Sequence, residues 1–224
     1  MSTAVRLMVV VPILAILGWA TMTAVDALRA DDLVREASLE MGTWAATSPP
    51  APETWASVRG KLDAGLLLRP NDPLSHELLG MLGSLRRDSP KHMDEGVAHL
   101  ARALEMRPVS PYSWAMVVEA RYLRGDPATE LELPMQRSMQ LGPSEPGVQR
   151  VIAEYGLAVW PELQPETRAQ VDRAVASGMR RNPLEMLRIS DRRGRLEAAC
   201  RHVIGSPNPD RRVGRYCERW EITP

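Results

Sequence analysis

Apolar side chains recur at helical spacing through most of the chain. Residues 96–106 have apolar positions at i, i+3, i+4 and i+7, which is one face of an α-helix: Val97, Leu100, Ala101 and Leu104. The next stretch has a similar stripe, formed by Trp114, Val117, Val118 and Tyr122. Gly125-Asp126-Pro127 then interrupts the pattern as a turn would. The pattern predicts an all-α protein built from helices separated by short turns.

The N-terminal part of the chain has a different pattern, because Leu7 to Val25 contains no charged residue. Nineteen helical residues at about 1.5 Å each reach roughly 28 Å, close to the ~30 Å hydrocarbon core of a bilayer. We therefore expect a single transmembrane helix over residues 7–28. A cleaved signal peptide and a buried helix of a soluble protein are the alternatives.

The positive-inside rule gives the expected orientation of this helix. Arg6 and the amino terminus are the positive charges before the apolar run, and Asp26, Arg29, Asp31 and Asp32 follow it. Arg29 and Arg35 on the far side count against this orientation. We favour residues 1–6 in the cytoplasm and the remainder of the chain across the membrane. A cleaved signal peptide would place the remainder in the same compartment.

Residues 29–54 are predicted to link the membrane segment to the rest of the chain. Spacings of 3, 4 and 3 predict a helix with one apolar stripe, formed by Val34, Ala37, Met41 and Trp44. This helix would be either a stalk that continues the membrane helix or a cap on the following helices. The proline-rich residues 47–52 predict a stiff, extended linker.

Proline recurs after the amphipathic stretches at intervals of 38, 35 and 40 residues, at Pro70, Pro108, Pro143 and Pro183. A period of 20–50 residues is typical of stacked helical units. Leu79-Gly80, Ala103, Pro108 and Trp114 resemble the pattern of the tetratricopeptide repeat family. The resemblance implies a right-handed solenoid of helix-turn-helix repeats over residues 55–183, closed by a C-terminal cap over residues 184–224.

Members of that family are usually scaffolds for protein interaction, and the first helix of each repeat lines the inner face. The resemblance therefore implies a partner groove lined by His76, Leu79, Gly83, Trp114, Val117 and Arg121. Trp114 has an alternative role in packing, which is the family's commoner use of that position.

The sequence contains no recognisable catalytic or metal-binding motif. His76-Glu77 begins like a zinc-protease motif, but Gly80 occupies the position that requires the second histidine. His92 and His99 are seven residues apart, two helical turns, which is too far for one small metal ion. We expect no enzymatic activity, no cofactor and no metal. The formal net charge of zero argues against nucleic-acid binding.

The C-terminal part is rich in arginine and contains both cysteines. Residues 180–224 hold 11 Arg against six acidic residues, a net charge of +5. We expect an anionic partner at this end, which would be a lipid head group, an acidic polysaccharide or an acidic protein face. The candidate residues are Arg192, Arg193, Arg195, Arg211 and Arg212. The alternative is a solvated, salt-bridged surface.

Cys200 and Cys217 are the only cysteines. In an oxidising compartment we expect them to form a disulfide, and the alternative is two unpaired buried thiols. An N-terminal anchor, degenerate repeats and an arginine-rich tail with cysteine resemble the layout of accessory proteins of bacterial exopolysaccharide biosynthesis and export. That resemblance implies a periplasmic scaffold held in the bacterial inner membrane.

The first hypothesis is therefore a non-enzymatic assembly factor for polysaccharide synthesis or export. The second is a repeat subunit that assembles another envelope system, such as cytochrome c maturation, a pilus or a secretion channel. The third is a hydrolase or a carbohydrate-processing enzyme with its substrate site at the arginine-rich tail.

Overall fold

The computed structural model describes residues 3–44, 50–203, 213–214 and 217–218, with the side chains from Val11 onward. Its regular structure is helical, and no strand occurs among these residues, so the prediction of an all-α protein is confirmed. The helices are α1 (Thr3–Gly42), α2 (Pro52–Leu68), α3 (Pro73–Ser84), α4 (Pro90–Met106), α5 (Pro111–Arg124), α6 (Ala128–Leu141), α7 (Pro146–Ala158), α8 (Pro165–Arg181), α9 (Pro183–Arg192) and α10 (Leu196–Cys200), with a 3-10 turn η1 (Trp160–Glu162) after α7.

Proline begins most of these helices. It lacks a backbone N–H and has a fixed φ, so it fits the first helical turn, where the N–H has no partner within the helix. The first helices α3, α5, α7 and α9 begin at Pro73, Pro111, Pro146 and Pro183, at intervals of 38, 35 and 37 residues. The structural period therefore follows the helix-starting prolines. Pro183, which the sequence pattern grouped with Pro143, belongs with Pro146.

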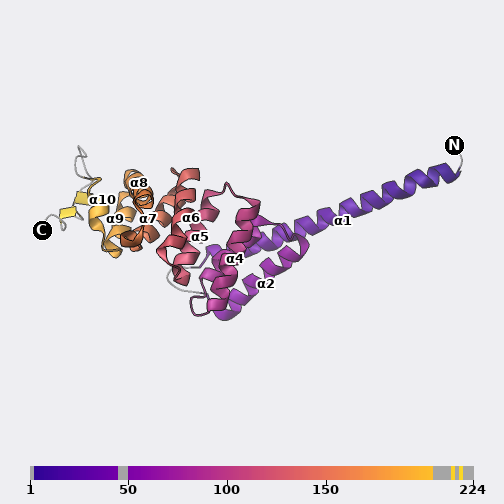
Figure 1. Ribbon diagram of the computed structural model, residues 1–224. Coiled ribbons are helices and arrows are strands. Elements are labelled where there is room, and N and C mark those ends of the chain that lie inside the picture. Colours follow the sequence, from indigo (N-terminus) through magenta and orange to yellow (C-terminus); the bar gives the residue numbers. More distant parts are fainter. Residues whose placement is uncertain (1–2, 45–49, 204–212, 215–216, 219–224) are drawn as a thin grey trace.

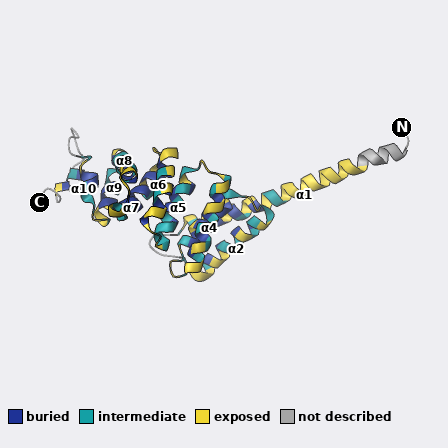
Figure 2. Ribbon diagram, in the orientation of Figure 1, coloured by how far each residue is buried: buried dark blue, intermediate teal, exposed yellow. Residues whose placement is uncertain are grey.

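Helix α1 is continuous from the apolar segment to Gly42. It is the one helix among the described residues that is long and apolar enough to cross a membrane. The predicted boundary between residues 28 and 29 is not a break. Figure 2 shows that α1 is exposed over the apolar residues from Val11 onward and becomes buried only where it meets the other helices.

The second half of α1 packs against α2 as the first pair of helices. From Val11 onward, Ala30 is the first buried residue of α1, and Val34 and Ala37 pack with Trp55, Val58 and Leu62 of α2. The two predicted roles of this segment, a continuation of the apolar helix and a cap on the helical array, are thus combined in one helix. Of the predicted proline-rich linker, residues 47–49 lie outside the described residues.

The following helices pair in chain order, α3 with α4, α5 with α6 and α7 with α8. Adjacent pairs contact through their first helices, α3 with α5, α5 with α7 and α7 with α9. In Figure 1 the pairs follow one another away from the exposed part of α1. A core of leucine, methionine, valine and alanine side chains joins α5 to α10.

Helices α3 and α4 approach unusually closely. A Cβ atom added to Gly83 would lie 2.5 Å from the carbonyl oxygen of His92 and 2.8 Å from the Cα of Gly96. Both neighbours are backbone atoms, so they cannot move aside as a flexible side chain would. Gly83 is therefore required for the packing of α3 on α4.

Candidate functional site: an arginine groove

The predicted inner-face residues of α3 and α5 lie largely in the interior. His76 is 8% exposed, and Leu79, Gly83 and Val117 are also buried. Leu79 packs against the α1–α2 pair, and Val117 packs beside Leu100 of α4. These four residues are covered by neighbouring helices, because the stripe that the sequence places on one helix face meets another helix here. They contribute to packing between the helices.

Trp114 and Arg121, the other two predicted groove residues, are half-buried and make local contacts. The Trp114 indole N–H donates to the carbonyl oxygen of Pro108 at 2.9 Å. Arg121 donates to both the backbone carbonyl (2.6 Å) and the side chain (3.0 Å) of Glu130. Trp114 is therefore held against the α4–α5 turn, and Arg121 joins α5 to α6.

An open groove does lie across the first helices, but farther along the array. It has a volume of about 650 Å³ and is lined by α5, α7 and α9 together with the α3–α4 turn. Five arginines and three glutamates line it, and we call it the arginine groove. These residues are Arg87, Arg150, Arg188, Arg192, Arg193, Glu119, Glu154 and Glu185.

One end of the arginine groove is an ordered ion-pair cluster centred on Glu154 of α7. Arg192 Nη2 lies 2.6 Å from one carboxylate oxygen of Glu154, and Arg193 Nη2 lies 2.7 Å from the other. The Arg193 guanidinium also lies over the rings of Tyr122 and Tyr155, 5.6 Å and 6.0 Å from their centroids. Arg193 therefore joins α9 to both α5 and α7.

The floor of the arginine groove contains a buried tyrosine–glutamate hydrogen bond. The hydroxyl of Tyr155 donates to Oε1 of Glu119 at 2.7 Å. Burial, together with the nearby Glu119 carboxylate, raises the pKa of Tyr155 well above its usual range. The phenol therefore stays protonated and holds the Glu119 carboxylate in place as a hydrogen-bond donor.

The remaining arginines of the groove are available to a ligand. Arg87, Arg150 and Arg188 are exposed. Within the described part of the chain, no carboxylate lies within 4.0 Å of any of the three. Guanidinium groups bind carboxylates and phosphates through paired hydrogen bonds, so three exposed, unneutralised ones favour an anionic ligand.

The predicted anion-binding residues are thus divided by the structure. Arg192 and Arg193 line the groove, although both are paired with Glu154. Arg195 lies outside its lining, with Nη1 3.8 Å from Glu197. Arg211 and Arg212 lie outside the described residues.

Sequence reasoning did not single out Arg87, Arg150 or Arg188. Arg150 is the fifth residue of α7, whereas Arg188 is the sixth of α9. Aligning the two helices on the prolines that begin them therefore places Arg150 beside the buried Leu187 and not beside Arg188. The sequence pattern offers no signal that groups these arginines, because packing of the helices brings them to one groove.

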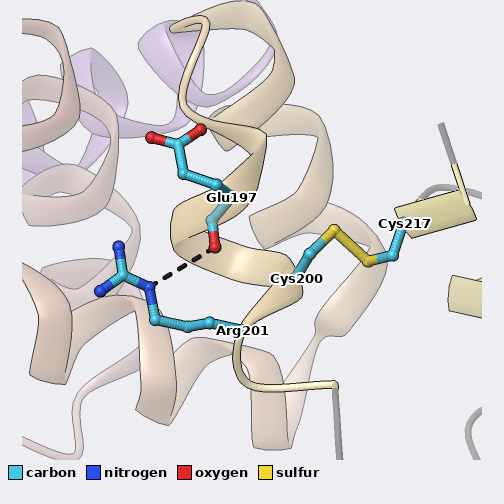
Figure 3. Close-up of a disulfide and its surroundings, with 4 residues drawn as sticks. All are labelled: Glu197, Cys200, Arg201 and Cys217. Atoms are coloured by element: carbon cyan, nitrogen blue, oxygen red, sulfur yellow. Dashed lines mark hydrogen bonds between the residues drawn. A yellow bond between two sulfur atoms is a disulfide. The ribbon is translucent and has the colours of Figure 1, made fainter. Parts of the chain in front are cut away.

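The sulfur atoms of Cys200 and Cys217 lie at disulfide-bonding distance, 2.11 Å (Figure 3). The bond ties residues of the C-terminal segment to α10, and Val213 and Cys217 pack into the core of α5 to α10. This pairing was expected from the sequence.

Within the described ranges, no group of three or more His, Cys, Asp or Glu side chains is arranged to hold a metal ion. His76 and His99 contact each other through their Nδ1 atoms. No protein-family model matches the sequence, and no curated protein matches it significantly.

Proposed function

We propose that this protein is a membrane-anchored, non-enzymatic helical-repeat scaffold that captures an acidic segment of a partner protein in the arginine groove. The exposed apolar part of α1 supports the anchor. The stacked pairs of helices support a tetratricopeptide-like array, in which first helices present an extended binding surface. Arg87, Arg150 and Arg188 carry the proposal, because they stand exposed and unneutralised along one groove.

A protein segment fits the groove better than a polysaccharide does. Sugar rings present apolar C–H faces, which require exposed aromatic or aliphatic surface. The two tyrosine rings of the groove are not open, because Arg193 lies over both of them. An extended acidic peptide requires only spaced cationic groups and hydrogen-bond donors, which the groove supplies.

A protein segment also fits better than a lipid head group. The groove is formed by α5, α7 and α9, which follow the α1–α2 pair along the array. Figure 1 shows these helices well separated from the exposed apolar part of α1. A membrane that contains α1 would lie at the opposite end of the molecule.

The proposed setting is the outer face of a bacterial inner membrane, where the scaffold would assist polysaccharide synthesis or export. The layout of anchor, repeats and disulfide-bonded tail supports this choice among envelope systems. A cytochrome maturation, pilus or secretion complex would use the same groove in the same way, so the partner's identity decides between these systems.

The test is affinity capture of partners from native membranes by the full-length protein in mild detergent. The groove variant carries Arg87→Glu, Arg150→Glu and Arg188→Glu. The matched control carries Arg107→Glu, Arg137→Glu and Arg181→Glu, which are exposed arginines outside the groove and change the net charge equally. We expect the control to retain the wild-type partners and the groove variant to lose them. Equal recovery by both variants would show that the groove is not the docking site.

A further inference from the structure

Leu67, near the C-terminal end of α2, is 85% exposed. It is the most exposed large hydrophobic side chain among those that the structure describes. Leu74, in the first turn of α3, is also exposed. The two leucines flank a turn without regular structure, and we call residues 66–74 the α2–α3 tip.

The α2–α3 tip lies beside the part of α1 that leaves the apolar segment. A Cβ atom on Gly65 would lie 3.8 Å from the carbonyl oxygen of Ala30, so the two helices touch at this level. One helical turn closer to the tip, Arg69 forms an ion pair with Asp31. Leu67 is therefore level with the residues just after the uncharged run.

The distance from the membrane follows from the continuity of α1. The uncharged run ends at Val25, and Ala30, where α1 becomes buried by α2, lies about 7.5 Å farther along the helix. The polar layer on each side of the hydrocarbon core is roughly 5–7 Å thick. Helix α1 has no break between these residues. The structure leaves no spacer between the bilayer and the α2–α3 tip.

We propose that the α2–α3 tip rests in the polar layer of the membrane, with Leu67 inserted toward the acyl chains of the leaflet from which α1 emerges. This inference rests on the proposed membrane anchoring by α1. Insertion removes an apolar side chain from water. Arg69 pairs with Asp31 of α1 and lies 4.0 Å from Asp72 within the tip, so both acidic groups enter the polar layer beside a cation.

The second contact has a consequence for the whole molecule. A single helix through a bilayer leaves the attached domain free to rotate about the helix axis and to tilt. A tip that enters the same leaflet is a second point of attachment, which restricts these motions and keeps one side of the domain facing the membrane. The helical array would then hold the arginine groove at a defined height and direction.

The test measures the depth of nitroxide labels in the full-length protein reconstituted in lipid nanodiscs. Labels are placed one at a time through Leu67→Cys, Leu133→Cys and Ile16→Cys. Leu133 on α6 is 56% exposed and Ile16 on α1 is 63% exposed, so each label replaces a side chain that does not support the fold. Cys200 and Cys217 are bonded to each other and do not react with the label.

We expect the label at position 67 to collide with oxygen, which concentrates in lipid, and to be several-fold less accessible to a water-soluble nickel chelate than the label at position 133. A label at 67 that meets the nickel chelate as freely as the label at 133, while the label at 16 is in lipid, overturns this inference and leaves the anchor intact. A label at 16 that is open to the nickel chelate overturns both proposals.

Discussion

The Nδ1 atoms of His76 on α3 and His99 on α4 lie 2.9 Å apart, so one ring must donate a proton to the other. Nε2 of His76 lies 3.2 Å from the carbonyl oxygen of Pro70, which can only accept a hydrogen bond. A neutral His76 therefore carries its proton on Nε2, and its Nδ1 accepts from His99. Two fully protonated rings would direct N–H groups at each other and break the contact.

This pair predicts a stability that depends on pH. Burial, followed by the charge of His76, lowers the pKa of His99 below its ordinary value of 6.5. Below about pH 6.5 the unfolded chain binds more protons at this position than the folded chain does, so stability falls as the pH falls. We expect the midpoint of urea unfolding to fall to lower urea concentration as the pH is lowered from 7 to 5. The dependence should be weaker in His99→Gln, which keeps a donor but does not titrate. Parallel profiles would contradict this assignment.

Gly83→Ala should destabilise the protein by about 1–3 kcal/mol, because the added methyl group meets the backbone of α4. Gly60→Ala is the matched control, since no atom lies within 4 Å of a Cβ at this exposed position of α2. An alanine there should stabilise the helix by roughly 0.5–1 kcal/mol. Chemical denaturation measures both free energies of unfolding. If Gly83→Ala were as stable as the wild type, the close approach of α3 and α4 would be wrong.

Reduction of the disulfide should lower the stability of the C-terminal part of the array. In the chain-entropy model, closing a loop with a sequence separation of 17 contributes about 3 kcal/mol. The measurement is thermal unfolding with and without a reductant. The Cys217→Ser variant should unfold at the midpoint of the reduced wild type and should not respond to the reductant. A reductant effect in that variant would point to a different cause.

Tyr155→Phe should cost about 1.5 kcal/mol, because it removes the donor to Glu119 in a buried position. Tyr112→Phe is a control of the same chemistry at the surface, where the hydroxyl donates to Glu145 at 2.5 Å. Its effect should stay within about 0.5 kcal/mol. Urea unfolding measures the free energy of unfolding of both variants. Similar decreases in the two variants would show that burial does not strengthen the hydrogen bond of Tyr155.

Much of the secondary structure could be predicted from the sequence, because helical periodicity and helix-starting prolines act locally. The apolar stripe of Trp114, Val117 and Val118 lies on a helix, as expected. The direction of each helix face depends on its neighbours and could not be read from that stripe. Gly83 meets α4, Leu79 packs against the α1–α2 pair and Val117 packs beside Leu100, so different neighbours bury the residues assigned to an open surface.

The arginine groove could be predicted only in part. Arg192 and Arg193 were expected to bind anions, yet both form ion pairs with the same carboxylate, that of Glu154, which lies 38 and 39 positions earlier. Arg150 and Arg188 carry the same charge and remain exposed. Composition counts charges but does not pair them. The arrangement of three helix pairs decides which arginine meets a carboxylate and which stays available to a ligand.

Because α1 is uninterrupted, its apolar segment and its half of the first helix pair are parts of one continuous helix. No hinge separates the exposed segment from the residues that pack on α2. A rotation of the apolar segment about its own axis is therefore transmitted to the first helix pair, on which the rest of the array is stacked. Two such helices lying side by side would fix the angle between their two grooves.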